Sequence, residues 1–156
     1  MSERTIVVKR PATVALLVLV TAAIIALTLS MTGKSYSKVD PVPFDELRHL
    51  YNRLHHRPIA THMLMLILAP AFLNVCLFIP WAFLMFLSLV TPERPTIIVY
   101  VLTILLGITF TCAIESTQYF LPSRVADIND VIWNSVGTAL GAVLGHMRKR
   151  IRFAFD

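Results

Sequence analysis

The chain has 156 residues, of which 56% are hydrophobic and only 15% are charged. Soluble domains average about 45–50% apolar and about 25% charged residues, so this composition excludes an ordinary soluble fold and indicates one membrane domain over residues 1–156. The net charge of +5 raises nucleic acid as a partner, but the cations flank apolar runs instead of forming an aromatic-interleaved basic stripe, which favours the lipid bilayer and excludes nucleic acid.

Residues 12–31 form the first predicted transmembrane helix. The run is uncharged and twenty residues long, so at about 1.5 Å per residue it spans the roughly 30 Å hydrocarbon core. Lys9 and Arg10 precede it, which raises the alternative of a cleaved signal peptide. The apolar region of a signal peptide is usually about 7–15 residues long, so the length favours a retained anchor.

The next stretch, residues 34–58, is a polar connection that contains a short amphipathic helix. Between Phe44 and Leu54, apolar side chains recur at steps of three and four. This spacing predicts a helix over 44–56 whose apolar face lies on the bilayer surface. Four nearby histidines raise the alternative of a metal site: His49, His55, His56 and His62. They lack an ordered ligand spacing and a completing carboxylate, so we expect neither a metal site nor a cofactor.

The long apolar run over 59–90 is predicted to be divided. As one straight helix its thirty-two residues would measure about 48 Å, well beyond the thickness of the hydrocarbon core. Pro70 and Pro80 each remove a helical hydrogen bond, and Asn74 between them needs a polar partner. We therefore expect an interfacial or re-entrant segment within about 44–71, followed by a second span over 72–90.

Two further spans, 96–120 and 128–146, complete a predicted all-α integral membrane bundle of four transmembrane helices. Basic residues near the span ends set its orientation. Eight of the fourteen cations share one side: Arg4, Lys9, Arg10, Arg94, Arg148, Lys149, Arg150 and Arg152. The positive-inside rule then predicts that both termini are cytoplasmic and that the segment from 115 to 130 faces the exterior.

Residues 115–134 concentrate polar groups that are rare at membrane depth, where such groups usually face a cavity or bind something. Glu115 and Gln118 lie one turn apart on one helix face, and Asp130 and Asn134 share a face of the following helix. A lone carboxylate is costly in lipid, which makes Glu115 the strongest functional candidate. The candidate ligand-binding residues are Asn74, Glu115, Gln118, Arg124, Asp127, Asp130 and Asn134.

Several of these residues also fit structural roles. Asp127 is predicted to cap the last helix, and Arg124 to pair with an acidic group or, alternatively, to clamp a phosphate. Asn74 and Gln118 suit interhelical hydrogen bonds as well as ligand contacts. Small residues at every fourth position predict close helix packing, here through Gly137, Gly141 and Gly145.

Catalysis is the competing interpretation of the paired carboxylates, since two acids can support acid–base or metal-assisted hydrolysis. The sequence contains no nucleophile elbow, phosphate-binding glycine loop or ordered histidine pair to complete such a mechanism. These observations favour a non-catalytic protein. Cys76 and Cys112 lie in apolar runs and are interpreted as small hydrophobic residues.

Two blocks resemble the VanZ-like family of small bacterial membrane proteins, named for a protein associated with teicoplanin resistance. Residues 74–84 are similar to its Asn-x-x-x-Phe-x-Pro-x-Gly element, and residues 114–141 to its Glu-x-x-Gln and Asp-x-x-Asp-x-x-x-Asn-x-x-Gly elements. The matching positions are Asn74, Phe78, Pro80, Glu115, Gln118, Asp127, Asp130, Asn134 and Gly137. Ala82 departs from the pattern, because the family commonly has glycine there.

This resemblance implies a helical protein of the bacterial cytoplasmic membrane. We expect an exterior-side polar pocket that binds or shields an amphiphile, such as a lipidated glycopeptide or a lipid-linked envelope intermediate, and that contributes to teicoplanin resistance. Two alternatives remain open. One is an enzyme that acts on a lipid-linked phosphate or sugar, and the other is an assembly subunit of an envelope complex.

Overall fold

Five helices and four two-residue strands make up the part of the chain that the computed structural model describes, which comprises residues 6–7, 10–30, 39–56, 61–122, 124–148 and 151–152. The helices are α1 (Arg10–Ser30), α2 (Asp45–His56), α3 (Thr61–Leu89), α4 (Thr96–Phe120) and α5 (Ile128–His146). The strands are β1 (Ile6–Val7), β2 (Val39–Asp40), β3 (Ala126–Asp127) and β4 (Ile151–Arg152). The predicted all-α class is therefore confirmed.

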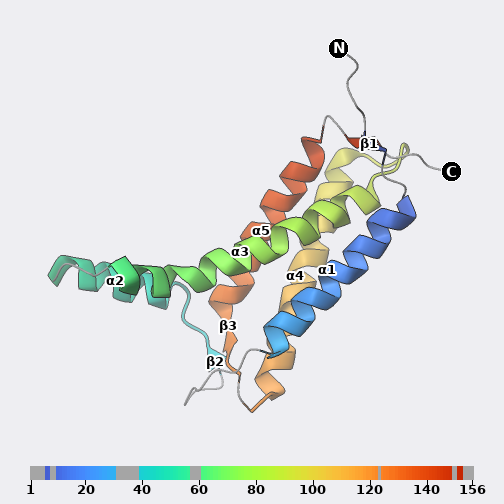
Figure 1. Cartoon of the computed structure of the whole chain (residues 1–156). Helices are drawn as coiled ribbons and strands as arrows, with labels where there is room; N and C mark the ends of the chain where they lie inside the picture. The colour runs from blue at the N-terminus through green and yellow to red at the C-terminus, as the bar shows by residue number, and fades with distance from the viewer. Residues whose placement is uncertain are drawn as a thin grey trace.

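Helices α1, α3, α4 and α5 lie side by side and alternate in direction, while α2 extends away from them (Figure 1). Two short parallel pairings mark the ends of this bundle. β1, before α1, pairs with β4, after α5, and β2 pairs with β3 at the opposite end. The polar connection before α2 and the segment before α5 consequently meet at one end of the bundle, which we call the β2–β3 end.

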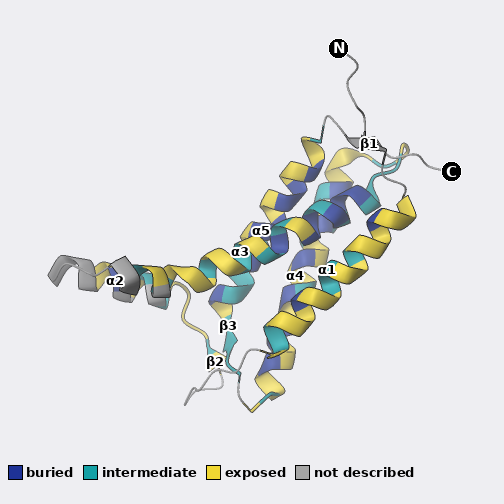
Figure 2. Cartoon of the chain, viewed as in Figure 1, coloured by how far each residue is buried: buried dark blue, intermediate teal, exposed yellow. Residues whose placement is uncertain are grey.

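Three helices among the described residues are long and apolar enough to cross a membrane: α1, the Ile67–Leu89 part of α3, and α4. Their outward faces carry large apolar side chains, such as Leu19 and Ile97, which are 65% and 67% exposed. Figure 2 shows this exposure along α1. So much exposed apolar surface is unfavourable in water and is expected where a helix contacts lipid.

The predicted break before the second span is wrong, because α3 runs without interruption from Thr61 to Leu89 and contains both Pro70 and Pro80. Proline is tolerated in membrane helices, where neighbouring groups compensate for the lost hydrogen bond. The excess length of α3 does not require a break either, since its first turns continue beyond the other helices together with α2 (Figure 1). Residues 61–71 therefore belong to α3 instead of forming a re-entrant segment.

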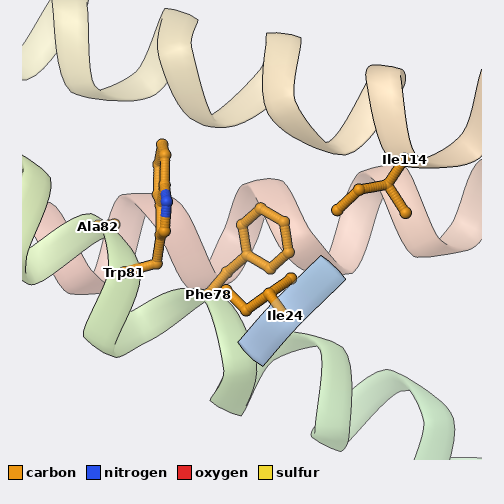
Figure 3. Packing of buried hydrophobic residues seen from close by; sticks show 5 residues of the cluster. All are labelled: Ile24, Phe78, Trp81, Ala82 and Ile114. Carbon is orange, nitrogen blue, oxygen red and sulfur yellow. The ribbon is translucent and has the colours of Figure 1, made fainter. Parts of the chain in front are cut away.

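The apolar core lies where α3 meets α1 and α4. Phe78, Trp81 and Ala82 of α3 are buried together with Ile24 of α1 and Ile114 of α4 (Figure 3). The Trp81 ring stacks on Phe110 with centroids 5.2 Å apart, and its Nε1 donates to Thr21 Oγ1 at 3.0 Å. The Trp81 indole thus pairs its only polar atom inside the core.

The glycines of α5 form a face that lies directly against α3. A Cβ atom added to Gly137 would lie 2.5 Å from the carbonyl oxygen of Val75, and one added to Gly141 would meet the carbonyl oxygen of Ile79. Next along this face, Gly145 meets the Phe86 ring. Only glycine allows two helix backbones to approach this closely. Ala82 packs opposite Gly141 with no exposed surface, so α3 tolerates an alanine where the family pattern has glycine.

Candidate functional site

A cavity of about 470 Å³ opens at the β2–β3 end of the bundle, between α1, α3, α4 and α5. One part of its wall is apolar, from α1 and α3, and comprises Leu27, Pro70, Leu73 and Leu77. The other part is polar and comprises Thr28, Asn74, Glu115, Gln118, Arg124, Asp130 and Asn134. Six of the seven predicted ligand-binding residues therefore line one cavity, and the exception is Asp127.

Glu115 lies on the buried face of α4, where it is only 7% exposed. The same face carries buried small residues at steps of four: Thr103, Gly107 and Thr111. Their small size lets α5 approach α4 closely. Glu115 Oε2 accepts a hydrogen bond from the backbone N–H of Asp127 at 2.9 Å. The carboxylate therefore fixes the entry of the chain into α5 and lines the cavity at the same time.

Asn74 connects α3 to α5 across the cavity. Its Nδ2 donates to Oδ1 of Asp130 at 2.5 Å, so the polar partner expected for this amide between the two prolines is a carboxylate of the last helix. Asp130 sits in the first turn of α5, where a negative charge also interacts favourably with the helix dipole. These two residues come from the two separate sequence blocks that carried the family resemblance.

Gln118 holds the segment between α4 and α5 in place. It is 1% exposed, and in the amide orientation that pairs both its ends, Nε2 donates to the Val125 carbonyl oxygen at 3.2 Å. Its Oε1 then accepts from Nη2 of Arg124 at 2.9 Å. Gln118 thus aligns the guanidinium of Arg124, the one cation among the described residues that line the cavity.

Asp127 caps α5, as the sequence predicted, because its carboxylate accepts from the backbone N–H of Asn129 at 2.7 Å. Burial raises the pKa of the Asp127 carboxyl, and the hydrogen bond from Asn129 opposes this change. Asp40, its register partner across the β2–β3 pairing, raises the same pKa further through like-charge repulsion. Asp127 does not line the cavity, and its carboxylate holds the first turn of α5 at this end of the bundle.

Asn134 is a buried polar residue of the cavity wall and is 2% exposed. Its Nδ2 donates to Thr111 Oγ1 at 2.8 Å, which joins α5 to α4. Among the described residues, no donor pairs with its Oδ1. A buried polar atom usually has a partner, so this unpaired acceptor marks a place where a ligand or water can donate.

The VanZ/LLP1 family model matches residues 13–149, which is most of the chain. The chain belongs to the VanZ/LLP1 family. No curated protein and no solved structure matches it. The positions that carried the resemblance serve different parts of the structure. Those that line the cavity are Asn74, Glu115, Gln118, Asp130 and Asn134. Phe78 and Gly137 lie at the contact between α3 and α5, Asp127 caps α5, and Pro80 is exposed on α3.

Sequence reasoning missed Asn129, which ties the connection before α2 to α5. Its Oδ1 accepts from the backbone N–H of Phe44 at 2.6 Å, and Phe44 has a positive φ of 60°. An aromatic residue rarely adopts that conformation, so the contact holds an unusual turn in place. Thr28 and Thr111 were also missed. The four-residue spacing of Thr103, Gly107, Thr111 and Glu115 was the signal that could have revealed Thr111.

The arrangement offers hydrogen bonds and charge next to an apolar wall, which is suited to holding a molecule with a polar head and a hydrocarbon chain. Within the described ranges, no three His, Cys, Asp or Glu side chains are placed to hold a metal ion. The histidines weighed for a metal site fall outside these, because the side chains of His49, His55, His56 and His62 are not described.

Proposed function

We propose that this VanZ/LLP1 family member is a four-span protein of the bacterial cytoplasmic membrane, with both termini in the cytoplasm and the cavity at the exterior side. Helix α5 would be the fourth span. Its 19 residues measure about 28 Å, close to the hydrocarbon thickness, and it packs along α3 through its glycine face. Arg10, Arg94 and Arg148 lie at the ends of helices away from the cavity, in agreement with the positive-inside rule.

Accessibility to a membrane-impermeant thiol reagent tests this orientation. In a variant without Cys76 and Cys112, we expect Val42→Cys to react from outside intact cells, because Val42 is exposed at the β2–β3 end. Glu93→Cys, in the exposed turn between α3 and α4, should react only after the cells are opened. Labelling of Glu93→Cys in intact cells, with protection of Val42→Cys, would invert the proposed orientation.

We further propose that the cavity binds an amphiphile, either a lipidated glycopeptide antibiotic or a lipid-linked envelope intermediate, and contributes in this way to teicoplanin tolerance. The observation that carries the proposal is the mixed lining of the cavity. Leu27, Leu73 and Leu77 can contact a hydrocarbon chain while the polar lining residues contact a head group. A volume of about 470 Å³ lies within the range of small-molecule sites, about 300–1,000 Å³.

Binding to the purified protein in lipid nanodiscs tests this function. We expect teicoplanin to bind with one-to-one stoichiometry and roughly tenfold more tightly than its deacylated core, because the acyl chain gains the apolar wall. Leu73→Trp should weaken binding, because the larger side chain occupies space in the cavity. Leu105→Trp, on an exposed face of α4, should leave binding unchanged. Equal affinity for both compounds, or product release from a lipid-linked substrate, would overturn the binding proposal, and the latter would favour an enzyme.

A further inference from the structure

The polar groups of the cavity differ in how much of their hydrogen-bonding capacity the fold already uses. Its amide donors are engaged: Asn74 Nδ2 donates to Asp130, Asn134 Nδ2 to Thr111, and Gln118 Nε2 to Val125. Each of these donors thus has a protein acceptor at 3.2 Å or closer. A ligand that needs donors from these amides would first have to break a contact of the fold.

The acceptors, in contrast, retain capacity. Asn134 Oδ1 is buried and has no donor among the described residues, and the whole residue is only 2% exposed. Glu115 Oε2 accepts from the Asp127 N–H, and its other carboxylate oxygen makes no hydrogen bond within the described part of the chain. Two groups of this wall, Asn134 Oδ1 and the carboxylate of Glu115, can therefore still accept from a hydrogen-bond donor.

Charge favours the same kind of ligand. The described cavity wall carries two carboxylates, Glu115 and Asp130, and one guanidinium, Arg124, whose Nη2 donates to Gln118. An anionic head group would meet an excess of negative charge at short range. A cationic head group would instead be attracted, and it would bring the donors that the acceptors lack.

We propose that the amphiphile held by this cavity carries a protonated primary amine, which donates to Asn134 Oδ1 and to the carboxylate of Glu115, while Asp130 adds negative potential. This inference rests on the proposed binding function and names its ligand class. A primary ammonium has three N–H donors and no acceptor, so it can satisfy both groups at once. A quaternary ammonium has the same charge and no N–H, so it can donate to neither group.

The test is a calorimetric titration of the full-length protein in nonionic detergent micelles with three single-chain probes: dodecylamine, dodecyltrimethylammonium and dodecyl phosphate. Dodecylamine should bind with one-to-one stoichiometry and at least tenfold more tightly than either other probe. The two cationic probes enter the micelle with the same charge, so their difference reports hydrogen bonding. Glu115→Gln should reduce dodecylamine affinity at least tenfold, whereas Glu93→Gln, a charge-matched control in an exposed turn away from the cavity, should leave it unchanged.

Asn134 is tested by two substitutions, since the loss of its bond to Thr111 could itself unfold the protein. Asn134→Leu should lose the preference for dodecylamine over dodecyltrimethylammonium, and Asn134→Asp, which adds an anionic acceptor, should increase dodecylamine affinity. Circular dichroism at the titration temperature shows whether each variant is folded. Equal binding of the two cations, or tighter binding of dodecyl phosphate, would overturn the amine assignment and leave amphiphile binding standing. Absence of stoichiometric binding by all three probes would overturn the amphiphile proposal as well.

Discussion

Replacement of Gly141 with leucine is expected to destabilise the protein by about 3 kcal/mol or more, at the upper end of the cost of overpacking a core. The reason is the atom that the new side chain would meet. A Cβ at this position runs into the carbonyl oxygen of Ile79, and the next nearest atoms are Cβ of Ala82 and the backbone nitrogen of Phe83. Backbone atoms cannot rotate away, so α3 and α5 would have to separate.

Thermal unfolding in detergent, followed by circular dichroism, measures this effect. For a chain of this length a loss of about 3 kcal/mol corresponds to a fall in Tm of roughly 10 °C. Leu140→Ile is the matched control, because Leu140 is the preceding residue of α5 and is 46% exposed. A similar Tm for the two variants would show that the glycine face does not hold α5 against α3.

The second large effect is expected for Glu115→Gln. Expressed in a susceptible bacterium, the unaltered protein should change tolerance to a lipidated glycopeptide more than to a non-lipidated one, because an amphiphile can reach a cavity within the bilayer. Loss of a hydrogen bond to a charged group costs about 1.5–3 kcal/mol, a factor of roughly ten to a hundred in affinity. The Glu115→Gln variant should therefore lose the difference between the two drugs.

The variant should nevertheless fold, because a glutamine oxygen can still accept from the Asp127 N–H that Glu115 binds. Protein abundance in the membrane fraction is measured alongside the minimal inhibitory concentrations to confirm this. Adding Asp130→Asn should cause little further loss, since residues that act as a unit are non-additive. Normal tolerance of Glu115→Gln at matched abundance would exclude a functional role for its charge, and equal responses to both drugs would exclude the amphiphile.

The bounds of α4 and α5 could be predicted from sequence because local signals mark them. Pro95 precedes α4 and Asp127 caps α5, and the expected ranges 96–120 and 128–146 coincide with the observed helices. The course of α3 could not be predicted in this way. Pro70 and Pro80 are strong local signals for a break, but packing of α3 against α1, α4 and α5 outweighs the hydrogen bonds that they remove.

The cavity was only partly predictable for a related reason. Helical spacing places Glu115 and Gln118 on one face, but it does not say which helix lies opposite. The contributions of Leu27 and Thr28 depend on where α1 packs, and the contact between Asn129 and Phe44 spans 85 residues of sequence. Such partners follow from tertiary structure alone, so no pattern within one helix could reveal them.

The unbroken α3 gives the bundle a mechanical property. Pro70 cannot donate to the carbonyl of residue 66, so the helix is weakened at the turn that also contributes Pro70 and Asn74 to the cavity. The turns before Pro70 continue outward toward α2, beyond the support of the other helices (Figure 1). A sideways displacement of α2 is therefore expected to bend α3 near Pro70, in the wall of the cavity.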